Sequence, residues 1–287
     1  MLVSTPLSPV FYLANHGTSF GMDDAGYGQT DRDRFKDEWL ATEVPAEAPL
    51  IANDEIGFHL INRPVFYRIH MQFAEFAEVL PKVEYALIDS LNDYALGTEN
   101  DIIFRGVAVE YQFIAHLVEN PDFHLLKAQD GLLLFGKEGD PLMQTVQVQD
   151  ADKPLPALTQ FEGDIALIDM QILPLEDNRY RLTYSWQALS ELNGRSPLIA
   201  VSQLEGVPHT RIIHLPTAIM APTTSWKPNQ IITETFEISL PDHISLEEYP
   251  LTVGWYDTGN LYAAQTDERS QLGDNYQLTP ETFGEQK

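Results

Sequence analysis

The segment 231–240 has the clearest alternation of hydrophobic and polar positions in the chain. Four apolar side chains share one parity, and polar side chains hold positions 233, 235, 237 and 239. The apolar set is Ile232, Phe236, Ile238 and Leu240. Such a period of two is typical of a strand with one buried face. The segment 251–256 alternates in the same way after a polar corner, which predicts two neighbouring strands.

Downstream of residue 160 the pattern predicts strands and no helix. The predicted strands are 167–173, 180–189, 198–203, 210–215, 231–240, 251–256 and 261–263. Turn-forming residues such as Asn193-Gly194 separate them. Short strands at this spacing predict an immunoglobulin-like β-sandwich.

The first half of the chain alternates helices with strands. The clearest helix is predicted over 107–119, and Asp130-Gly131 between two apolar runs predicts a hairpin. The other predicted elements are helices at 31–42 and 72–80 and strands at 50–52, 65–69 and 85–89. Strands that alternate with helices favour a small α/β domain with a mostly parallel sheet and a C-terminal hairpin.

These patterns predict two domains, α/β followed by all-β. Residues 1–29 are expected to form an N-terminal arm and loop, and residues 30–139 the α/β domain. Residues 140–159 contain few large apolar side chains and are interpreted as a linker, and residues 160–287 as the sandwich with a polar tail.

The composition is strongly acidic and restricts the classes of partner. Lys and Arg number 17 against 43 Asp and Glu, which gives a net charge of -26 spread over both halves of the chain. Because nucleic acid binding requires a basic surface, no nucleic acid partner is expected. The absence of cysteine excludes thiol catalysis, disulfides and thiolate metal sites.

No apolar run is long enough to cross a bilayer. The apolar start at 2–13 lacks the basic region of a signal peptide. Two interpretations of this start stay open: a plain N-terminal arm, or the exit from a segment upstream.

One candidate metal site lies in a glycine-rich loop. His16, Asp23 and Asp24 carry ligand atoms that a divalent cation such as Ca²⁺ accepts, but their spacing matches no calcium-binding loop. A structural role is therefore preferred, and no cofactor is expected. Asp31 and Asp33 have the D-x-D spacing of nucleotide-sugar enzymes, yet side chains two apart on a helix point in different directions, so helix capping is preferred.

Two other sets of side chains are candidates for binding or catalysis. Trp226 and Tyr256 lie near ends of predicted strands and are candidates for stacking on sugar rings, with packing as the default interpretation. Asp54, Glu55 and Asp89 lie at predicted strand ends and are the carboxylates that glycoside hydrolysis in a cleft between the domains would use.

Several segments of the first half resemble a known family. They are Val44-Pro45-Ala46-Glu47-Ala48 with the strand after it, Phe58-His59-Leu60, Arg63-Pro64-Val65-Phe66-Tyr67, the strand from Val83 to Asp89, and Asp130-Gly131-Leu132-Leu133-Leu134-Phe135. This series is similar to the soluble part of an uncharacterised family of polytopic membrane proteins, itself similar to the C-type glycosyltransferases that use lipid-linked sugars. The apolar start with Pro6 and Pro9 resembles the exit from that family's last membrane helix.

A second resemblance covers residues 226–257. The pattern W-x-P-x-Q, a strand, L-P and Y-x-L-x-V-G-x-Y-D resembles the sandwich domain often appended to membrane glycosyltransferase-like proteins of bacteria. Asn229 stands where that pattern usually has glycine. In C-type enzymes the catalytic acid lies between early membrane helices, so the resemblance carries no catalytic residue onto this chain.

The resemblance implies a non-catalytic, extracytoplasmic accessory module of a glycosyltransferase-like membrane protein. Such a module would be tethered to its parent membrane domain and would position an acceptor glycan or a protein partner at the cell exterior. Two alternatives stay open. One is a stand-alone glycan-binding or surface-assembly protein, and the other is a hydrolase or transferase with a site between the domains.

Overall fold

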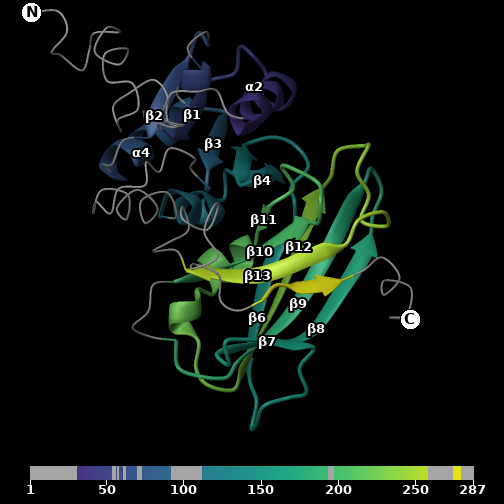
Figure 1. Ribbon diagram of the computed structural model, residues 1–287. Helices are drawn as coiled ribbons and strands as arrows, with labels where there is room; N and C mark the ends of the chain where they lie inside the picture. Colours follow the sequence, from purple (N-terminus) through teal and green to yellow (C-terminus); the bar gives the residue numbers. More distant parts are fainter. Residues whose placement is uncertain are drawn as a thin grey trace, which may run out of the picture.

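The structure is a computed structural model (Figure 1) in which the chain is rich in β-structure. It describes residues 31–53, 56, 58–60, 63–69, 73–91, 112–192, 197–257 and 274–278. These residues form three sheets. One sheet and its helices make up the mixed-sheet unit, residues 31–136, and the other two sheets make up the two-sheet unit, residues 144–278. Within the described ranges, no helix is long and apolar enough to cross a membrane.

The sheet of the mixed-sheet unit has the strand order β2-β1-β3-β5-β4. Strand β1 (Leu50–Asn53) pairs in parallel with β2 (Phe66–Ile69) and with β3 (Tyr85–Asp89). Strand β5 (Leu132–Gly136) pairs antiparallel with β3 and with β4 (His124–Gln129). The expected mostly parallel sheet is therefore mixed. The reason is the two-residue hairpin, which makes β4 and β5 antiparallel while β5 inserts beside β3.

The predicted Asp130-Gly131 hairpin is confirmed. Both residues have positive φ, 47° for Asp130 and 78° for Gly131, as a type I′ turn requires. A Cβ atom on Gly131 would lie 2.4 Å from Cγ of Leu91, so glycine is required here by conformation and by space.

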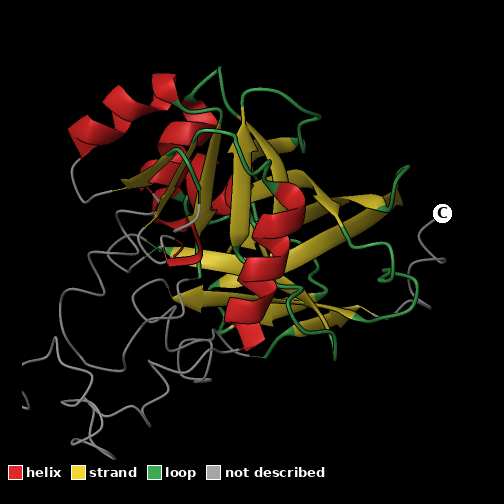
Figure 2. Cartoon of the chain, turned by 90° about the horizontal axis from the view of Figure 1, so that it is seen from above, coloured by secondary structure: helices red, strands yellow, loops and turns green. Residues whose placement is uncertain are grey.

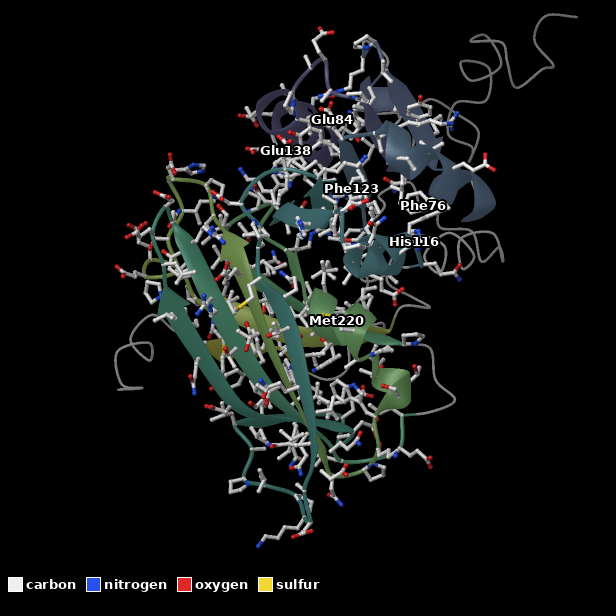
Figure 3. The ribbon with its side chains drawn as sticks, turned by 180° about the vertical axis from the view of Figure 1, so that it is seen from behind. Phe76, Glu84, His116, Phe123, Glu138 and Met220 are labelled. Carbon is white, nitrogen blue, oxygen red and sulfur yellow. The ribbon has the colours of Figure 1, made fainter. Side chains whose placement is uncertain are left out.

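Helices cover both faces of the mixed sheet (Figure 2). Helix α2 (Asp31–Glu43) packs Trp39 and Leu40 against one face. Helix α4 (Phe73–Val79) and the helical residues 112–119 pack against the other face. Figure 3 shows Phe76 beside His116, whose rings lie 5.5 Å apart and join these two helices. Short 3₁₀ helices at η1 (Phe58–Leu60) and η2 (Leu80–Lys82) complete the unit.

The two-sheet unit buries one core between a five-stranded and a four-stranded sheet. The first has the order β6-β12-β9-β8-β7 and the second β11-β10-β13-β14. The bounds are β6 Gln144–Asp150, β7 Thr159–Phe161, β8 Ile165–Pro174, β9 Arg179–Ala188, β10 Leu198–Leu204, β11 Ile212–Ile213, β12 Gln230–Ser239, β13 Leu251–Asp257 and β14 Tyr276–Leu278. The helical turns are η3 (Pro216–Met220) and η4 (Thr223–Ser225). Trp186, Trp255 and Tyr184 are the largest side chains fully buried in this core.

The segment 140–159, expected as a linker, contributes β6 and the first residue of β7 to the five-stranded sheet. Strand β6 pairs with β12 from Gln144 to Asp150, and β7 begins at Thr159. Main-chain hydrogen bonds place β6 at the sheet edge, where most of its side chains stay exposed. An edge strand therefore needs few large apolar residues, which is why the composition of this segment did not reveal it.

The two units share a hydrophobic core. Ile199, Ile213 and Leu215 of the two-sheet unit lie in one cluster with buried residues of the mixed-sheet unit such as Ile51 and Phe76. This cluster lies between the mixed sheet and the four-stranded sheet, which are neighbours in Figure 1. The relative position of the units is thus fixed by packing.

Candidate functional site

Trp226, a predicted sugar-stacking residue, is buried. Its side chain is 3% exposed, and its Nε1 donates to the carbonyl of Ala221 at 2.8 Å. The ring packs edge-on against Trp255 at 5.5 Å. The prediction of glycan contact at Trp226 is wrong in this structure because the π-helical turn η3 and the turn η4 fold the indole into the core.

Tyr256, the second aromatic candidate, is half-buried. Its ring packs against the core shared by the units, and Nδ2 of Asn275 donates to its hydroxyl at 3.3 Å. Tyr256 and Trp226 belong to different core clusters, so no aromatic surface unites them.

Of the three predicted cleft carboxylates, Asp89 lies within the described residues. Asp89 ends β3 as expected, but its side chain is buried and ion-paired. Asp54 and Glu55 lie outside the described residues. The candidate metal ligands His16, Asp23 and Asp24 also lie outside them.

Asp89 belongs to a buried ion cluster at the end of the mixed sheet. We call this set the junction cluster: Arg32, Lys36, Asp89, Asp130, His209 and Arg211. Arg32 donates to both carboxylate oxygens of Asp89, with Nη1 to Oδ2 at 2.8 Å and Nη2 to Oδ1 at 2.7 Å. Nζ of Lys36 lies 2.9 Å from Oδ2 of Asp89. Asn53, at the end of the parallel neighbour β1, exchanges hydrogen bonds with the Asp89 main chain.

Asp130 connects the two units through the same cluster. Its carboxylate accepts Nε of Arg32 at 3.0 Å from helix α2. From the two-sheet unit, Arg211 donates through Nε at 2.6 Å and Nη2 at 2.9 Å, and Nδ1 of His209 lies at 3.3 Å. The hairpin turn thus sets the position of a carboxylate that binds cations from both units.

The junction cluster keeps its carboxylates ionised. Burial alone would raise the pKa of Asp89, but Arg32 and Lys36 outweigh it and lower this pKa to about 2. Burial is likewise outweighed at Asp130, whose hydrogen bonds from His209 and Arg211 hold its pKa well below the usual range. Opposite charges therefore compensate each other in the junction cluster.

A second buried polar group crosses the core of the two-sheet unit. We call it the core chain: Tyr184, Ser202, His214 and Glu234. The Tyr184 hydroxyl lies 2.8 Å from Oγ of Ser202, which lies 2.8 Å from Nε2 of His214. Nδ1 of His214 lies 2.6 Å from Oε1 of Glu234. All four side chains are buried.

Two further donors satisfy the Glu234 carboxylate. Nε1 of Trp186 donates to Oε1 at 2.7 Å, and Oγ1 of Thr217 donates to Oε2 at 2.9 Å from η3. Burial raises the pKa of Tyr184, so its hydroxyl stays protonated. One arrangement of protons then satisfies every member: Tyr184 donates to Ser202, Ser202 to Nε2 of His214, and Nδ1–H of His214 to Glu234.

The order serine, histidine, carboxylate is that of a hydrolase triad. Ser202, His214 and Glu234 have 0% exposed surface, and their surroundings are the aromatic rings of the core. A substrate cannot reach Ser202 in this conformation. One feature of the sequence indicates this group. Glu234 has the same parity as the apolar set in 231–240, and a carboxylate on the buried face of a strand needs buried hydrogen-bond donors.

An accessible cleft of about 630 Å³ lies where helix α2 and β4 meet loops of the two-sheet unit. We call it the junction cleft. One wall is the face of α2 that carries Phe35, Glu38, Trp39, Thr42 and Glu43. The opposite wall is formed by loops at 207–209 and 239–244, with Asp177 and Tyr249. Sequence analysis missed this site because neither wall is complete within one unit.

The loop walls are held in place by hydrogen bonds and stacking. Nδ2 of Asn178 lies within 3.1 Å of the carbonyls of Leu240, Pro241 and Ile244. The His209 ring stacks on Phe35 with centroids 4.7 Å apart and planes 4° from parallel. The junction cluster lies behind this stack, so the cleft is formed before any ligand binds.

The rim of the junction cleft is acidic. Glu43 is paired with Lys127 at 2.6 Å. Glu38, Asp177 and Asp242 are exposed and form no ion pair with a described residue. Across the described ranges, no group of three His, Asp or Glu side chains is close enough to hold a metal ion.

We compared the chain with known proteins, and no family model, curated protein or solved structure matches it.

Proposed function

We propose that this chain is a non-catalytic binding module that holds a partner in the junction cleft. The observation that carries this proposal is a cleft whose two walls come from different units. Buried ion pairs, ring stacking and the hydrogen bonds of Asn178 hold these walls in place. Rigid walls reduce the conformational entropy that binding loses, which favours recognition. The serine, histidine and carboxylate of the core chain are closed to solvent.

We further propose an immunoglobulin-like assignment for the two-sheet unit and an α/β assignment for the mixed-sheet unit. Two antiparallel sheets over one aromatic core support the first. Helices on both faces of a sheet with parallel strands β2, β1 and β3 support the second. Asn229 has a positive φ of 66°, a conformation that asparagine tolerates, so the pattern keeps its turn without the usual glycine.

The proposed setting is the cell exterior, as the accessory part of a glycosyltransferase-like membrane protein. Its support is the resemblance of the segments 44–67, 83–89, 130–135 and 226–257. Sequencing of the native gene upstream of the Met1 codon tests this setting. Several apolar segments of about 20 residues, each long enough to span a bilayer, are expected there. A gene that begins at Met1 would contradict it.

The binding role is tested with a variant that fills the cleft. Thr42 is exposed on the α2 wall, and Thr42→Trp would place an indole in the junction cleft. Thr145→Trp puts the same side chain on the exposed edge strand β6 and is the matched control. Ligands selected from glycan and peptide arrays should bind the wild type and Thr145→Trp, and should bind Thr42→Trp at least tenfold more weakly. If Thr42→Trp and Thr145→Trp bind the ligands equally well, the junction cleft is not the binding site.

A second candidate function is serine hydrolysis by the core chain. The favouring observation is the pair of distances that joins Ser202, His214 and Glu234, 2.8 Å and 2.6 Å. It ranks second because catalysis would require η3 to open. A fluorophosphonate probe on the isolated chain distinguishes the two functions. No labelling is expected, whereas labelling that Ser202→Ala abolishes would establish an accessible nucleophile and overturn the non-catalytic assignment.

A further inference from the structure

We infer that the ligand of the junction cleft is a cationic polypeptide segment rich in lysine or arginine. This inference rests on the proposed binding function and names the chemistry of its partner. Two independent observations carry it: three exposed carboxylates without an ionic partner among the described residues, and a buried indole donor without an acceptor in the same cleft.

The carboxylates come from three separate elements around the cleft. Glu38 lies on α2, Asp177 in the loop between β8 and β9, and Asp242 in the loop after β12. Thr42 and Glu43 at the C-terminal end of α2 line the cleft, so the negative end of the helix dipole lies there, and the last turn carries no basic residue to offset it. The chain as a whole has a net charge of -26, which attracts cations over a longer range.

Because these carboxylates come from three separate elements, a single metal ion is not the preferred ligand. A metal ion needs several oxygen ligands within about 2.0–2.6 Å, and the described residues contain no such group of three acids. An extended chain of cations can instead meet each carboxylate with a separate ammonium or guanidinium group. The aliphatic stems of Lys and Arg would pack on the apolar parts of the walls, such as Pro241 and the Tyr249 ring.

Trp39 supplies the second observation. Its side chain lines the cleft and is 4% exposed, and Nε1 has no hydrogen-bond partner in the described part of the chain. A buried donor without an acceptor is destabilising. Nε1 has under 1 Å² of exposed surface, so an acceptor from a ligand would complete this site when a side chain of the cleft moves on binding. The main-chain carbonyl of a peptide is such an acceptor. Sugar hydroxyls also accept hydrogen bonds, but a neutral sugar gains nothing from the surplus of carboxylates.

The test compares two variants of the full chain with equal charge. The cleft variant combines Glu38→Gln, Asp177→Asn and Asp242→Asn. The control variant combines Glu119→Gln, Asp122→Asn and Asp152→Asn, which are exposed and do not line the cleft. Both lose three negative charges and the same residue types, so long-range attraction changes equally. Asparagine suits position 177, where φ is 58°.

The probes are hexalysine, hexaglutamate, a chitin oligosaccharide and Ca²⁺, titrated at about 0.15 M salt. We expect hexalysine to bind the wild type and the control variant alike, and the cleft variant roughly eightfold to a hundredfold more weakly, because each of the three exposed ion pairs adds roughly two- to fivefold in affinity. The indole N–H signal of Trp39, assigned with Trp39→Phe, should shift on binding. Trp39→Phe itself should weaken binding.

Each of the other outcomes contradicts either the cationic ligand or the proposed binding function. Equal hexalysine affinity of the two variants would show non-specific attraction and overturn the cationic ligand, as would binding of Ca²⁺ in its place. Binding of the oligosaccharide with a shift of the Trp39 signal would overturn the ligand class and leave the binding function intact. If none of the probes shifts the Trp39 signal, the cationic ligand fails. If Thr42→Trp also leaves array binding unchanged, the proposed function fails with it.

Discussion

The junction cluster and the core chain are both buried polar groups, but they are built on opposite principles. The junction cluster balances two carboxylates with Arg32, Lys36 and Arg211. The core chain places Glu234 among Trp186, Thr217 and His214, which donate as neutral groups in the arrangement derived above. One group relies on charge compensation and the other on hydrogen-bond satisfaction.

The difference follows from what each group connects. The junction cluster joins α2, the ends of β3 and β4, and a loop of the other unit, so few main-chain hydrogen bonds hold these parts together. Long cationic side chains can span that junction. The core chain lies between strands already fixed by β-pairing, so it needs only to satisfy its own polar atoms. Loss of a partner should therefore be more destabilising in the junction cluster.

Asp89→Asn is the strongest test of this comparison. It keeps the side-chain shape but removes one of the two buried carboxylates that balance Arg32, Lys36 and Arg211. Unfolding free energy should fall by about 3–5 kcal/mol, the usual loss when one partner of a buried ion pair is removed. Urea denaturation followed by tryptophan fluorescence measures it. A loss below about 1 kcal/mol would mean that the cluster is solvated and not charge-compensated.

Glu234→Gln should have a smaller effect in the core chain. The amide oxygen can still accept from Trp186 and His214, and only the hydrogen bond from Thr217 must rearrange. We expect a loss of about 1.5–3 kcal/mol, the range for hydrogen bonds to a charged group. The same denaturation experiment, with exposed Glu47→Gln as the control, checks it. A loss larger than that of Asp89→Asn would reverse the comparison.

Acid should weaken the junction cluster of the wild type. The pKa of Asp89 is lowered to about 2 from its ordinary value of 3.8. A depressed pKa adds stability that is fully present above the unfolded value and is lost as pH falls from about 4 to 2. The contribution is about 2 kcal/mol. Denaturation of the wild type and Asp89→Asn between pH 6 and 2 isolates it, because the gap between the two curves should narrow by about 2 kcal/mol in acid. Parallel curves would contradict the assignment.

Tyr184→Phe should give the smallest effect. Ser202 keeps His214 as its partner, so only one neutral hydrogen bond is lost from the chain. A loss of about 0.5–1.5 kcal/mol is expected. His214 ring ¹⁵N shifts should stay those of a neutral imidazole with the proton on Nδ1. Imidazolium shifts in either protein would refute the proton arrangement of the core chain.

Much of the secondary structure was predictable because its causes are local. Parity placed β12 and β13, and the pair Asp130-Gly131 placed the hairpin. The edge strand β6 escaped prediction, since it is fixed by its pairing with β12 and not by buried side chains. Trp226 was a candidate for sugar contact because it lies near the end of a predicted strand, and the turns η3 and η4 fold it inward.

The sequence by itself determined the strand and helix periods, the turn that requires glycine at position 131, and an acidity that disfavours polyanions. Only the tertiary structure decided that Asp130 meets Arg211, 81 residues away, that Glu234 meets His214, and that α2 faces the loops of the other unit across a cleft. The physical reason is range. Propensity and turn chemistry act over a few residues, whereas pairing of buried charges and formation of a cleft depend on how distant segments pack.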